Sequence, residues 1–406
     1  MVSRGLHKIE SSDGSHPEKA AILGPCRVVS QEYPNLLCRS IDFEEEAAKV
    51  YDRQRIVQQL CFELRASPPD RVIAYRGTNR WVQSFDRVKL EPGPEIPLTL
   101  REGGVYLITG GLGNIGFSIG RYLAEAVQAR LVLTSRSPFP GQEPGNRGAQ
   151  RVKQLEELGA RVLVVQADAA DREQVRQAVR QAEATFGNLH GVLYAAGIMA
   201  DQAFKLIADS DRQDCQLHFR AKIQGLLVLE EVLKDKELDF CLLTSSLSPI
   251  LGGLSLFAYS AANSFMDAFA HRQALVRGKP WLSINWADWQ QNNGEPNSES
   301  CANLLLGSTV SQLHITAEEG KETFKRVLSL FADGKRVPGI VISSGDLHRR
   351  LRQWVMPESG LQVEAGSEGT SKSSQAAVHQ RPRLQSIYEP PKNVTGMTEA
   401  LTSVLI

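Results

Sequence analysis

Three polar side chains in the stretch 240–267 have the types and the spacing needed for acid–base chemistry on a carbonyl group. An apolar run ends at Ser246, and Tyr259 follows thirteen residues later at the start of a helix-like stretch. Asn263 comes four residues after Tyr259, so the two share one helix face. Reduction of a carbonyl group needs a proton donor for the oxygen and a hydrogen bond that holds it. This constellation therefore predicts a carbonyl-reducing site.

The phenol of such a site needs a nearby cation, because the pKa of an ordinary tyrosine is near 10. The common arrangement places a lysine four residues after the tyrosine, but Asn263 occupies that position here. The only Tyr-x-x-x-Lys pattern runs from Tyr388 to Lys392 and contains two prolines, so one helix cannot present both side chains. Any cation for Tyr259 must come from another part of the chain.

A glycine-rich loop follows the apolar run 105–109 and opens a helix-like stretch. Its glycines at 111, 113 and 116 form the pattern G-x-G-x-x-G, which lets the chain turn tightly and lets a pyrophosphate approach the backbone at the helix N-terminus. Between a strand and a helix this pattern predicts a dinucleotide site, with a ligand-free turn as the alternative. The predicted contacts are Thr109, Gly110, Gly111, Leu112, Gly113, Asn114, Ile115 and Gly116.

The end of the second strand indicates which dinucleotide binds. An NAD site usually places an acid there, whereas an arginine accommodates the 2′-phosphate of NADPH. Arg136 lies between Ser135 and Ser137, so the sequence predicts NADPH, and an exposed strand-end arginine is the alternative. Adenine and nicotinamide-ribose contacts are expected after the third and fourth strands, at Asp168, Ala169, Ala195, Ala196 and Gly197.

A competing pattern lies in the same region. The residues 116–120 match the G-x-S-x-G motif of hydrolases, in which the serine must sit on the sharp turn between strand and helix. Ser118 comes nine residues after Thr109 and falls inside the expected helix, so we interpret it as a helix residue.

The elements that must position these side chains are apolar runs that alternate with amphipathic stretches such as 115–127 and 172–186. Continuous Val, Ile and Leu runs separated by helices indicate a parallel sheet covered on both faces. The sequence therefore predicts an α/β fold with a doubly wound Rossmann-type parallel sheet, whose strand ends meet at one crevice. The expected strands begin at Val105, Arg130, Arg161, Gly191, Phe240, Trp281 and Gly339.

The rest of the chain differs in its pattern of apolar runs and in its composition. Residues 20–99 hold short strand-like runs at 21–29, 72–74 and 81–85 around a helix near 43–64, without a glycine-rich phosphate loop. The predicted organisation is a flexible segment 1–19, a non-catalytic subdomain 20–99, a catalytic subdomain 100–356 and a disordered linker 357–406 rich in Ser, Gly and Gln.

Composition excludes several classes of function. Lys plus Arg and Asp plus Glu are equal at 46 each, so there is no electrostatic signature for nucleic acid or an anionic membrane. The six cysteines are scattered and predict neither a disulfide framework nor a metal site. No apolar run approaches the roughly 20 residues that span a bilayer, and no signal peptide is apparent. A cytoplasmic protein is expected.

Together these motifs resemble the ketoreductase domain of a modular polyketide synthase, in the short-chain dehydrogenase/reductase superfamily. The matching motifs are T-G-G-x-G-x-x-G at 109–116, S-R-S at 135–137, S-S at 245–246 and Y-x-A-A-N at 259–263. In this family the asparagine follows the tyrosine by four and the lysine lies on the preceding helix, which points to Lys222, 24 residues before Ser246. Asn114 and Tyr194 depart from the family's frequent Gly and His.

The resemblance implies a role for each candidate. Tyr259 would donate the proton, Ser246 would hold the substrate oxygen, Lys222 would lower the pKa of the tyrosine and contact the ribose, and Asn263 would complete the proton relay. The implied reaction is NADPH-dependent reduction of a β-ketoacyl thioester on an acyl carrier protein. Taken singly, each residue has a plain structural interpretation: a core tyrosine, a strand-end serine, a surface lysine and a helix asparagine.

The resemblance also implies partners and alternatives. Residues 20–99 would be a truncated Rossmann-like structural subdomain, and the tail would lead toward an acyl carrier domain beside other polyketide synthase domains, with the excised domain a monomer. One alternative is an inactive structural domain, whose signature would be a missing Lys, Ser or Tyr. The other is a stand-alone alcohol dehydrogenase, which the first subdomain and the tail disfavour.

Two positions bear on product configuration. Family members that make the D-hydroxyl carry an Leu-Asp-Asp motif after Ala-Ala-Gly, and those that make the L-hydroxyl tend to carry Trp eight residues before the tyrosine. Here only Asp201 of the first motif is present, and Leu251 occupies the second position. The resemblance thus implies the D-hydroxyl product, with Asp201 as a plain helix N-cap the alternative.

Overall fold

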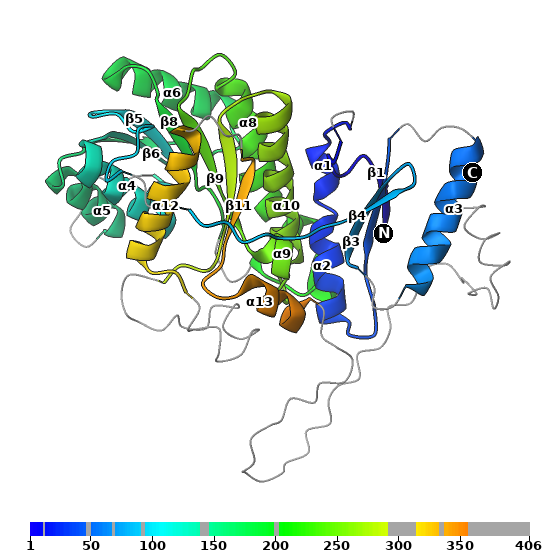
Figure 1. Cartoon of the computed structure of the whole chain (residues 1–406). Coiled ribbons are helices and arrows are strands. Elements are labelled where there is room, and N and C mark those ends of the chain that lie inside the picture. The colour runs from blue at the N-terminus through cyan, green and yellow to red at the C-terminus, as the bar shows by residue number, and fades with distance from the viewer. Residues whose placement is uncertain are drawn as a thin grey trace, which may run out of the picture.

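The computed structural model describes residues 1–10, 13–45, 50–66, 70–90, 94–138, 146–198, 203–290, 314–332 and 337–355. They form two α/β units side by side, each built around its own sheet (Figure 1). The linker predicted at 357–406 lies outside the described residues.

The larger unit contains a seven-stranded parallel sheet, which confirms the predicted doubly wound architecture. Its strand order is β11-β10-β9-β8-β5-β6-β7, so the winding reverses between β5 and β8 and opens a crevice at the strand ends. The strands are β5 (Val105–Thr109), β6 (Arg130–Ser135), β7 (Arg161–Gln166), β8 (Gly191–Tyr194), β9 (Phe240–Ser246), β10 (Trp281–Trp286) and β11 (Gly339–Ile342).

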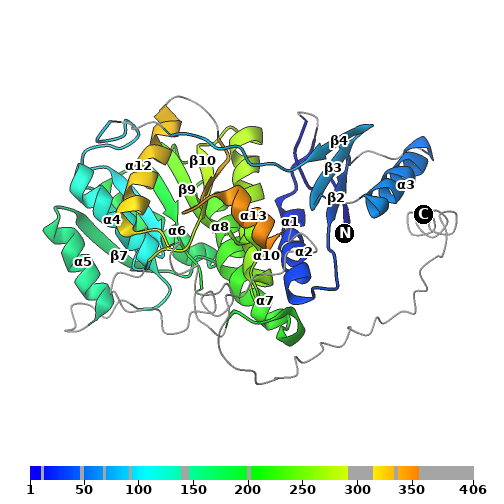
Figure 2. The same ribbon diagram turned by 60° about the horizontal axis from the view of Figure 1, so that its bottom comes forward.

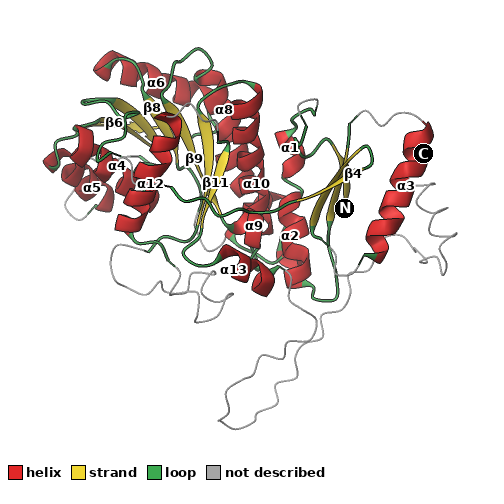
Figure 3. Cartoon of the chain, in the orientation of Figure 1, coloured by secondary structure: helices red, strands yellow, loops and turns green. Residues whose placement is uncertain are grey.

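Helices cover both faces of this sheet because its strands are apolar on both sides. Alternate residues of β5 enter two separate cores: Tyr106 and Ile108 pack into one, and Val105 and Leu107 into the other. The first core includes α4 (Asn114–Val127), α5 (Arg147–Glu157) and α12 (Ala317–Ala332), and the second includes α6 (Arg172–Phe186), α8 (Gly225–Val232) and α10 (Phe257–His271) (Figure 3). Ser118 lies in α4, as expected.

The smaller unit has a four-stranded sheet in the order β1-β2-β3-β4. The strands are β1 (Val2–Arg4), β2 (Ser40–Phe43), β3 (Val72–Arg76) and β4 (Asn79–Val82), and only β3 and β4 are antiparallel. On one face α3 (Val50–Arg65) packs its Ile56 and Leu60 against the sheet (Figure 2). On the side toward the larger unit lie α1 (Pro17–Ala20) and α2 (Leu23–Glu32).

Two expectations for this unit were wrong. The apolar run 21–29 is not a strand but most of α2, in which the buried Gly24 and Val28 lie four residues apart on one face. A short apolar run suits either element, and packing against α10 decides here for the helix. The predicted flexibility of 1–19 does not hold for Val2–Arg4, which pairs with β2 as an edge strand.

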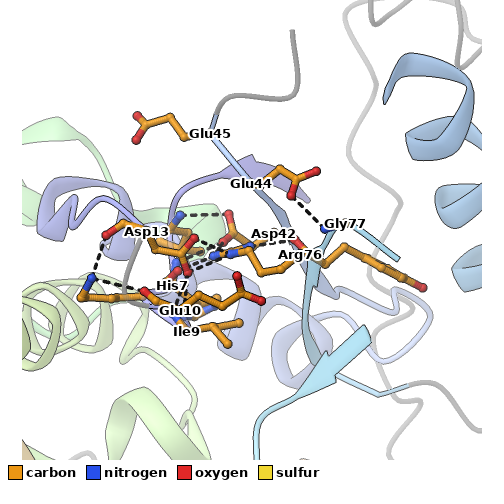
Figure 4. A network of polar contacts seen from close by, with 12 residues as sticks. His7, Ile9, Glu10, Asp13, Asp42, Glu44, Glu45, Arg76 and Gly77 are labelled. Carbon is orange, nitrogen blue, oxygen red and sulfur yellow. Dashed lines mark hydrogen bonds and ion pairs between the residues drawn. The ribbon is translucent and has the colours of Figure 1, made fainter. Parts of the chain in front are cut away.

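A buried ion network fixes the segment that follows β1. Figure 4 shows the Arg76 guanidinium beside the carboxylates of Asp13 and Asp42, at 2.8 Å and 3.0 Å. Asp42 also accepts hydrogen bonds from the backbone N–H groups of Leu6 and His7. Burial alone would raise the pKa of Asp13. Hydrogen bonds from backbone N–H groups and from Arg76 outweigh this effect, so the pKa of Asp13 is lowered overall.

The two units meet where α2 crosses α10, and Gly24 is the point of closest approach. A Cβ atom at Gly24 would lie 2.2 Å from the backbone nitrogen of Ala261 and 2.7 Å from the carbonyl oxygen of Phe257. Only a glycine lets the helix backbones come this near.

Gly24→Ala is therefore expected to lower the free energy of unfolding by about 1–3 kcal/mol, because the helices must separate. Thermal and urea unfolding measure the effect. The control is Gly120→Ala in α4, where the added methyl group meets only ordinary contacts at 3.6 Å or more. Its free energy of unfolding should rise by about 0.5–1 kcal/mol, because alanine has the higher helix propensity. Equal stability of the two variants would contradict the packing argument.

Candidate active site

A cleft of about 1170 Å³ lies at the carboxyl ends of the central strands and contains most of the predicted site. It brings together residues expected to bind the cofactor and residues expected to act on the substrate. The predicted residues that line it are Gly110, Leu112, Gly113, Asn114, Ile115, Gly116, Ser135, Arg136, Ser137, Asp168, Ala169, Ala195, Ala196, Gly197, Lys222, Ser246, Leu251 and Tyr259.

Three predicted residues lie behind the cleft wall. The Thr109 hydroxyl accepts a hydrogen bond from the backbone N–H of Ala195 at 3.1 Å and so joins the ends of β5 and β8. Gly111 packs against Leu133, which a Cβ atom at 111 would meet at 2.7 Å. Asn263 is fully buried in α10. Asp201 lies outside the described residues.

The glycine loop has the backbone form that an anion site requires. Gly110 has a φ of +66°, which disfavours other residues, and Gly113 is the N-cap of α4 with no side chain over the helix end. A Cβ atom at Gly116 would lie 2.8 Å from the Gly110 carbonyl oxygen. The first N–H groups of α4 therefore face the cleft from a bare backbone cradle, which fits a pyrophosphate.

Arginines surround this cradle. Arg136 is exposed at the end of β6 and forms no ion pair with any residue that the structure describes. Arg147 and Arg151 both donate to the Asn114 side-chain oxygen, at 3.1 Å and 2.6 Å. Burial and the neighbouring Arg147 lower the pKa of Arg151 to about 10, and Arg151 forms no ion pair with the residues that the structure describes. Sequence reasoning missed Arg147 and Arg151, whose only signal was their spacing of four at a helix start.

Asp168 is paired on the other side of the cleft. Its carboxylate accepts two hydrogen bonds from the Arg220 guanidinium, at 2.9 Å and 3.2 Å, and one from the backbone N–H of Ala170. Burial would raise the pKa of Asp168, but these donors and the positive charge of Arg136 lower it overall. The acid is thus held ionised beside the position where an adenine would lie.

Ser246 and Tyr259 lie side by side in the cleft. Burial raises the pKa of Tyr259, whereas hydrogen bonding to Ser246 and Asn263 acts in the opposite direction. The Asn263 amide donates to the Tyr259 backbone oxygen at 2.9 Å, and its side-chain oxygen has no hydrogen-bond partner among the described residues. Buried, unpaired acceptors are uncommon, so this oxygen is available to a proton donor such as water.

Lys222 approaches the tyrosine from a π-helical segment, Arg220–Gln224, between α7 (Arg212–Phe219) and α8. Its ammonium lies 5.4 Å from the centre of the Tyr259 ring and donates to the Thr244 carbonyl oxygen at 3.2 Å. Burial lowers the pKa of Lys222 to about 8, although the charge of Asp267 opposes the shift. Such π-helical turns are frequent at functional sites, and this one directs the lysine inward.

Tyr194 stabilises the π-helical segment. Its hydroxyl donates to the carbonyl oxygen of Ala221, the residue before Lys222. Gly225 leaves room for that hydroxyl, which would lie 2.2 Å from a Cβ atom. Tyr194, where the sequence departs from the family's frequent His, thus holds the backbone beside the lysine.

Sequence reasoning also missed a buried network behind the cleft. The Asn285 amide contacts the Asp267 carboxylate at 2.7 Å, the Ser246 carbonyl oxygen at 2.9 Å and the Ser245 hydroxyl at 3.1 Å. Burial raises the pKa of Asp267 to about 6. Through Asn285 this carboxylate fixes the strand end that carries Ser246.

Aromatic rings enclose Tyr259. The rings of Phe204 and His218 lie edge-on to it, with centroids at 5.7 Å and 5.5 Å. The His218 ring donates to the Ala203 carbonyl oxygen at 2.8 Å, and burial lowers the pKa of this histidine.

Two other kinds of site are absent from the part of the chain that the structure describes. In the described ranges no helix is long and apolar enough to cross a membrane. The same residues contain no group of three or more His, Cys, Asp or Glu side chains that could hold a metal ion.

Comparison with known proteins gives one family for the cleft. Residues 104–291 match the KR domain family. The polyketide synthase PksM of Bacillus subtilis is 33% identical over 268 residues, which cover 66% of this chain and 6% of that protein. A phenolphthiocerol/phthiocerol polyketide synthase subunit of Mycobacterium tuberculosis is 28% identical over 333 residues, or 81% of this chain and 17% of that protein. The chain therefore spans a small part of these relatives.

Solved structures show the same fold. An A-type ketoreductase from a modular polyketide synthase superimposes with a TM-score of 0.72 at 24% identity, covering 88% of this chain and 70% of that one. A ketoreductase domain from the bacillaene assembly line gives a TM-score of 0.67 at 24% identity, covering 83% and 77%.

Proposed function

We propose that the chain catalyses NADPH-dependent reduction of a β-ketoacyl thioester to the β-hydroxyacyl thioester during polyketide chain extension, in keeping with the match of residues 104–291 to the KR domain family. The acyl group would be carried by an acyl carrier protein, beside other polyketide synthase domains. One observation carries the proposal: Ser246, Tyr259 and Lys222 line the same cleft as the glycine cradle at the start of α4.

The cleft residues can divide the acid–base work between them. Bound NADPH would supply the hydride. The Ser246 hydroxyl would donate a hydrogen bond to the substrate carbonyl oxygen, and Tyr259 would give that oxygen its proton. Lys222, 5.4 Å from the ring centre, would stabilise the phenolate that remains. Lys222 would then give a proton to the phenolate, and a water held by the unpaired Asn263 oxygen would pass a proton from solvent to Lys222.

The cofactor assignment rests on the cradle and its arginines. The α4 N-terminus would bind the pyrophosphate, with Arg151 adding positive charge behind Asn114. Arg136 would meet the 2′-phosphate that distinguishes NADPH from NADH. Its exposure and its lack of an ion pair within the described chain leave the guanidinium free to do so.

Arg136→Ala is expected to raise the Kd for NADPH about thirtyfold and to leave the Kd for NADH unchanged, because a charge-assisted pair with phosphate is lost. Quenching of protein fluorescence by each nucleotide measures both constants without turnover. Arg180→Ala, an exposed arginine on α6, is the control and should bind both as the parent does. An equal loss for the two nucleotides would remove Arg136 from the 2′-phosphate site.

Product configuration is part of the proposal. Leu251 lines the cleft and is almost fully buried, at 8% exposure, where the family's L-specific members tend to carry Trp. We propose that the D-hydroxyl predominates.

The experiment that tests the function is turnover of NADPH with a carrier-bound β-ketoacyl thioester, compared with a free small ketone, which a stand-alone alcohol dehydrogenase would prefer.

A further inference from the structure

Two adjacent side chains at the end of α2 reach from the non-catalytic unit to the backbone of the catalytic one. The Gln31 amide donates to the Leu251 carbonyl oxygen at 2.7 Å and accepts from the Gly253 N–H at 2.7 Å. It also donates to the Trp354 carbonyl oxygen at 3.1 Å, at the end of α13 (Leu347–Trp354). Gln31 therefore ties α2 to the loop that follows α9 (Ser248–Leu251).

Glu32 joins two segments that are distant in sequence. One carboxylate oxygen accepts from the backbone N–H of Ile207 at 2.6 Å, and the other accepts from the N–H of Ser255 at 2.9 Å. Burial raises the pKa of Glu32, and these two donors oppose the shift. A half-buried carboxylate with two backbone donors holds both segments at a fixed separation.

Both segments border the substrate end of the cleft. The first contains Phe204, whose ring lines the cleft and lies edge-on to Tyr259. His218 holds this segment at Ala203 and Glu32 holds it at Ile207, so it is fixed on both sides of Phe204. The second lies between the cleft residues Gly252 and Leu256 and leads directly into α10.

The second segment needs this external support. Ser255 has a φ of +61°, and Gly252 and Gly253 have φ values of +77° and +135°. A serine in the left-handed region costs free energy, and such a conformation persists only where the surroundings determine it. Here the surroundings are Gln31 and Glu32.

We infer that Glu32, assisted by Gln31, is a positioning residue that fixes the acyl-binding side of the cleft and thereby the affinity for the thioester and the configuration of the product. This inference rests on the proposed function. Glu32 itself does not line the cleft. Because α2 packs on α9 and α10 whereas the glycine cradle lies between β5 and α4, we expect changes at Glu32 to leave NADPH binding unaffected.

Glu32→Ala is expected to raise the KM for a β-ketoacyl thioester about tenfold and to turn a single product configuration into a mixture, with the Kd for NADPH unchanged. Glu32→Gln keeps one oxygen acceptor, so the KM and the product ratio should change less than in Glu32→Ala. The control is Glu18→Gln, an exposed carboxylate in the same unit. Steady-state kinetics, chiral chromatography of the product and nucleotide titration measure the three quantities. If Glu32→Ala fails to fold, Glu32→Gln and Gln31→Ala decide the question.

Hydrogen–deuterium exchange of the peptides 203–210 and 252–258 provides a readout independent of catalysis. Faster exchange of both peptides in Glu32→Ala supports the tether, and unchanged exchange overturns it. If the parent protein reduces no thioester, the proposed function fails, while the exchange data still decide the tether. If the parent is active and Glu32→Ala keeps its KM and its product ratio, the positioning role is wrong.

Discussion

Replacing Tyr259 with phenylalanine is expected to lower kcat for thioester reduction about a thousandfold, because the site loses its proton donor. The change removes one oxygen and keeps the ring, which packs against Phe204 and His218. Binding of NADPH should therefore persist, and the melting temperature should change little. Steady-state kinetics with a β-ketoacyl thioester measure kcat, and nucleotide titration shows that the cleft is intact.

The matched control for this variant is Tyr122→Phe. Tyr122 is buried, and among the described residues its hydroxyl makes one long contact, 3.5 Å to the Glu95 carbonyl oxygen, outside the cleft. Loss of this hydroxyl should leave kcat within about twofold of the parent, because a group outside the cleft contributes little to catalysis. Turnover of Tyr259→Phe at the parental rate would assign proton donation to another group.

Lys222→Met is expected to lower kcat about a hundredfold, because the phenolate formed at Tyr259 loses its nearest cation. Methionine fills a similar volume, so the protein should fold. The pKa of Lys222 is lowered to about 8 by burial. The ammonium form is present below that pKa and is lost as the pH rises through it. Activity of the parent should therefore fall above about pH 8, and this fall should be absent from the pH–rate profile of Lys222→Met.

Lys279→Met provides the comparison for the lysine variant. Lys279 is exposed after the helix end, and its side-chain ammonium donates to the Lys234 carbonyl oxygen at 3.3 Å. Its replacement should preserve both kcat and the pH profile. An alkaline fall that survives unchanged in Lys222→Met would mean that a different group titrates there.

Local patterns predicted the parts of the fold that depend on neighbouring residues. The glycine loop, the strand that precedes it and the helix that follows are contiguous in sequence, so their spacing alone determined β5 and α4. Tyr259 and Asn263 share one helix turn, which periodicity also predicts. Lys222 was reached only through the family resemblance, because nothing local indicates the π-helical turn that directs it inward.

The remaining features depend on contacts between distant segments. Glu32 meets Ile207 across 175 positions, and no local pattern marks the pair. In the sequence Asp267 looks like an ordinary helix residue, because its partner Asn285 lies on another element, β10. The run 21–29 was misread as a strand because its helical form is selected by packing on α10, at Gly24 and Ala261.

The proposed reaction is the reduction of a carrier-bound β-ketoacyl thioester at the expense of NADPH. Its most direct test follows the acyl group on an acyl carrier protein by mass spectrometry while the oxidation of NADPH is measured in the same sample. We expect that each NADPH oxidised converts one β-ketoacyl group into a β-hydroxyacyl group. Protein that binds NADPH but leaves the β-ketoacyl group unchanged would contradict it and would identify the chain as an inactive structural domain.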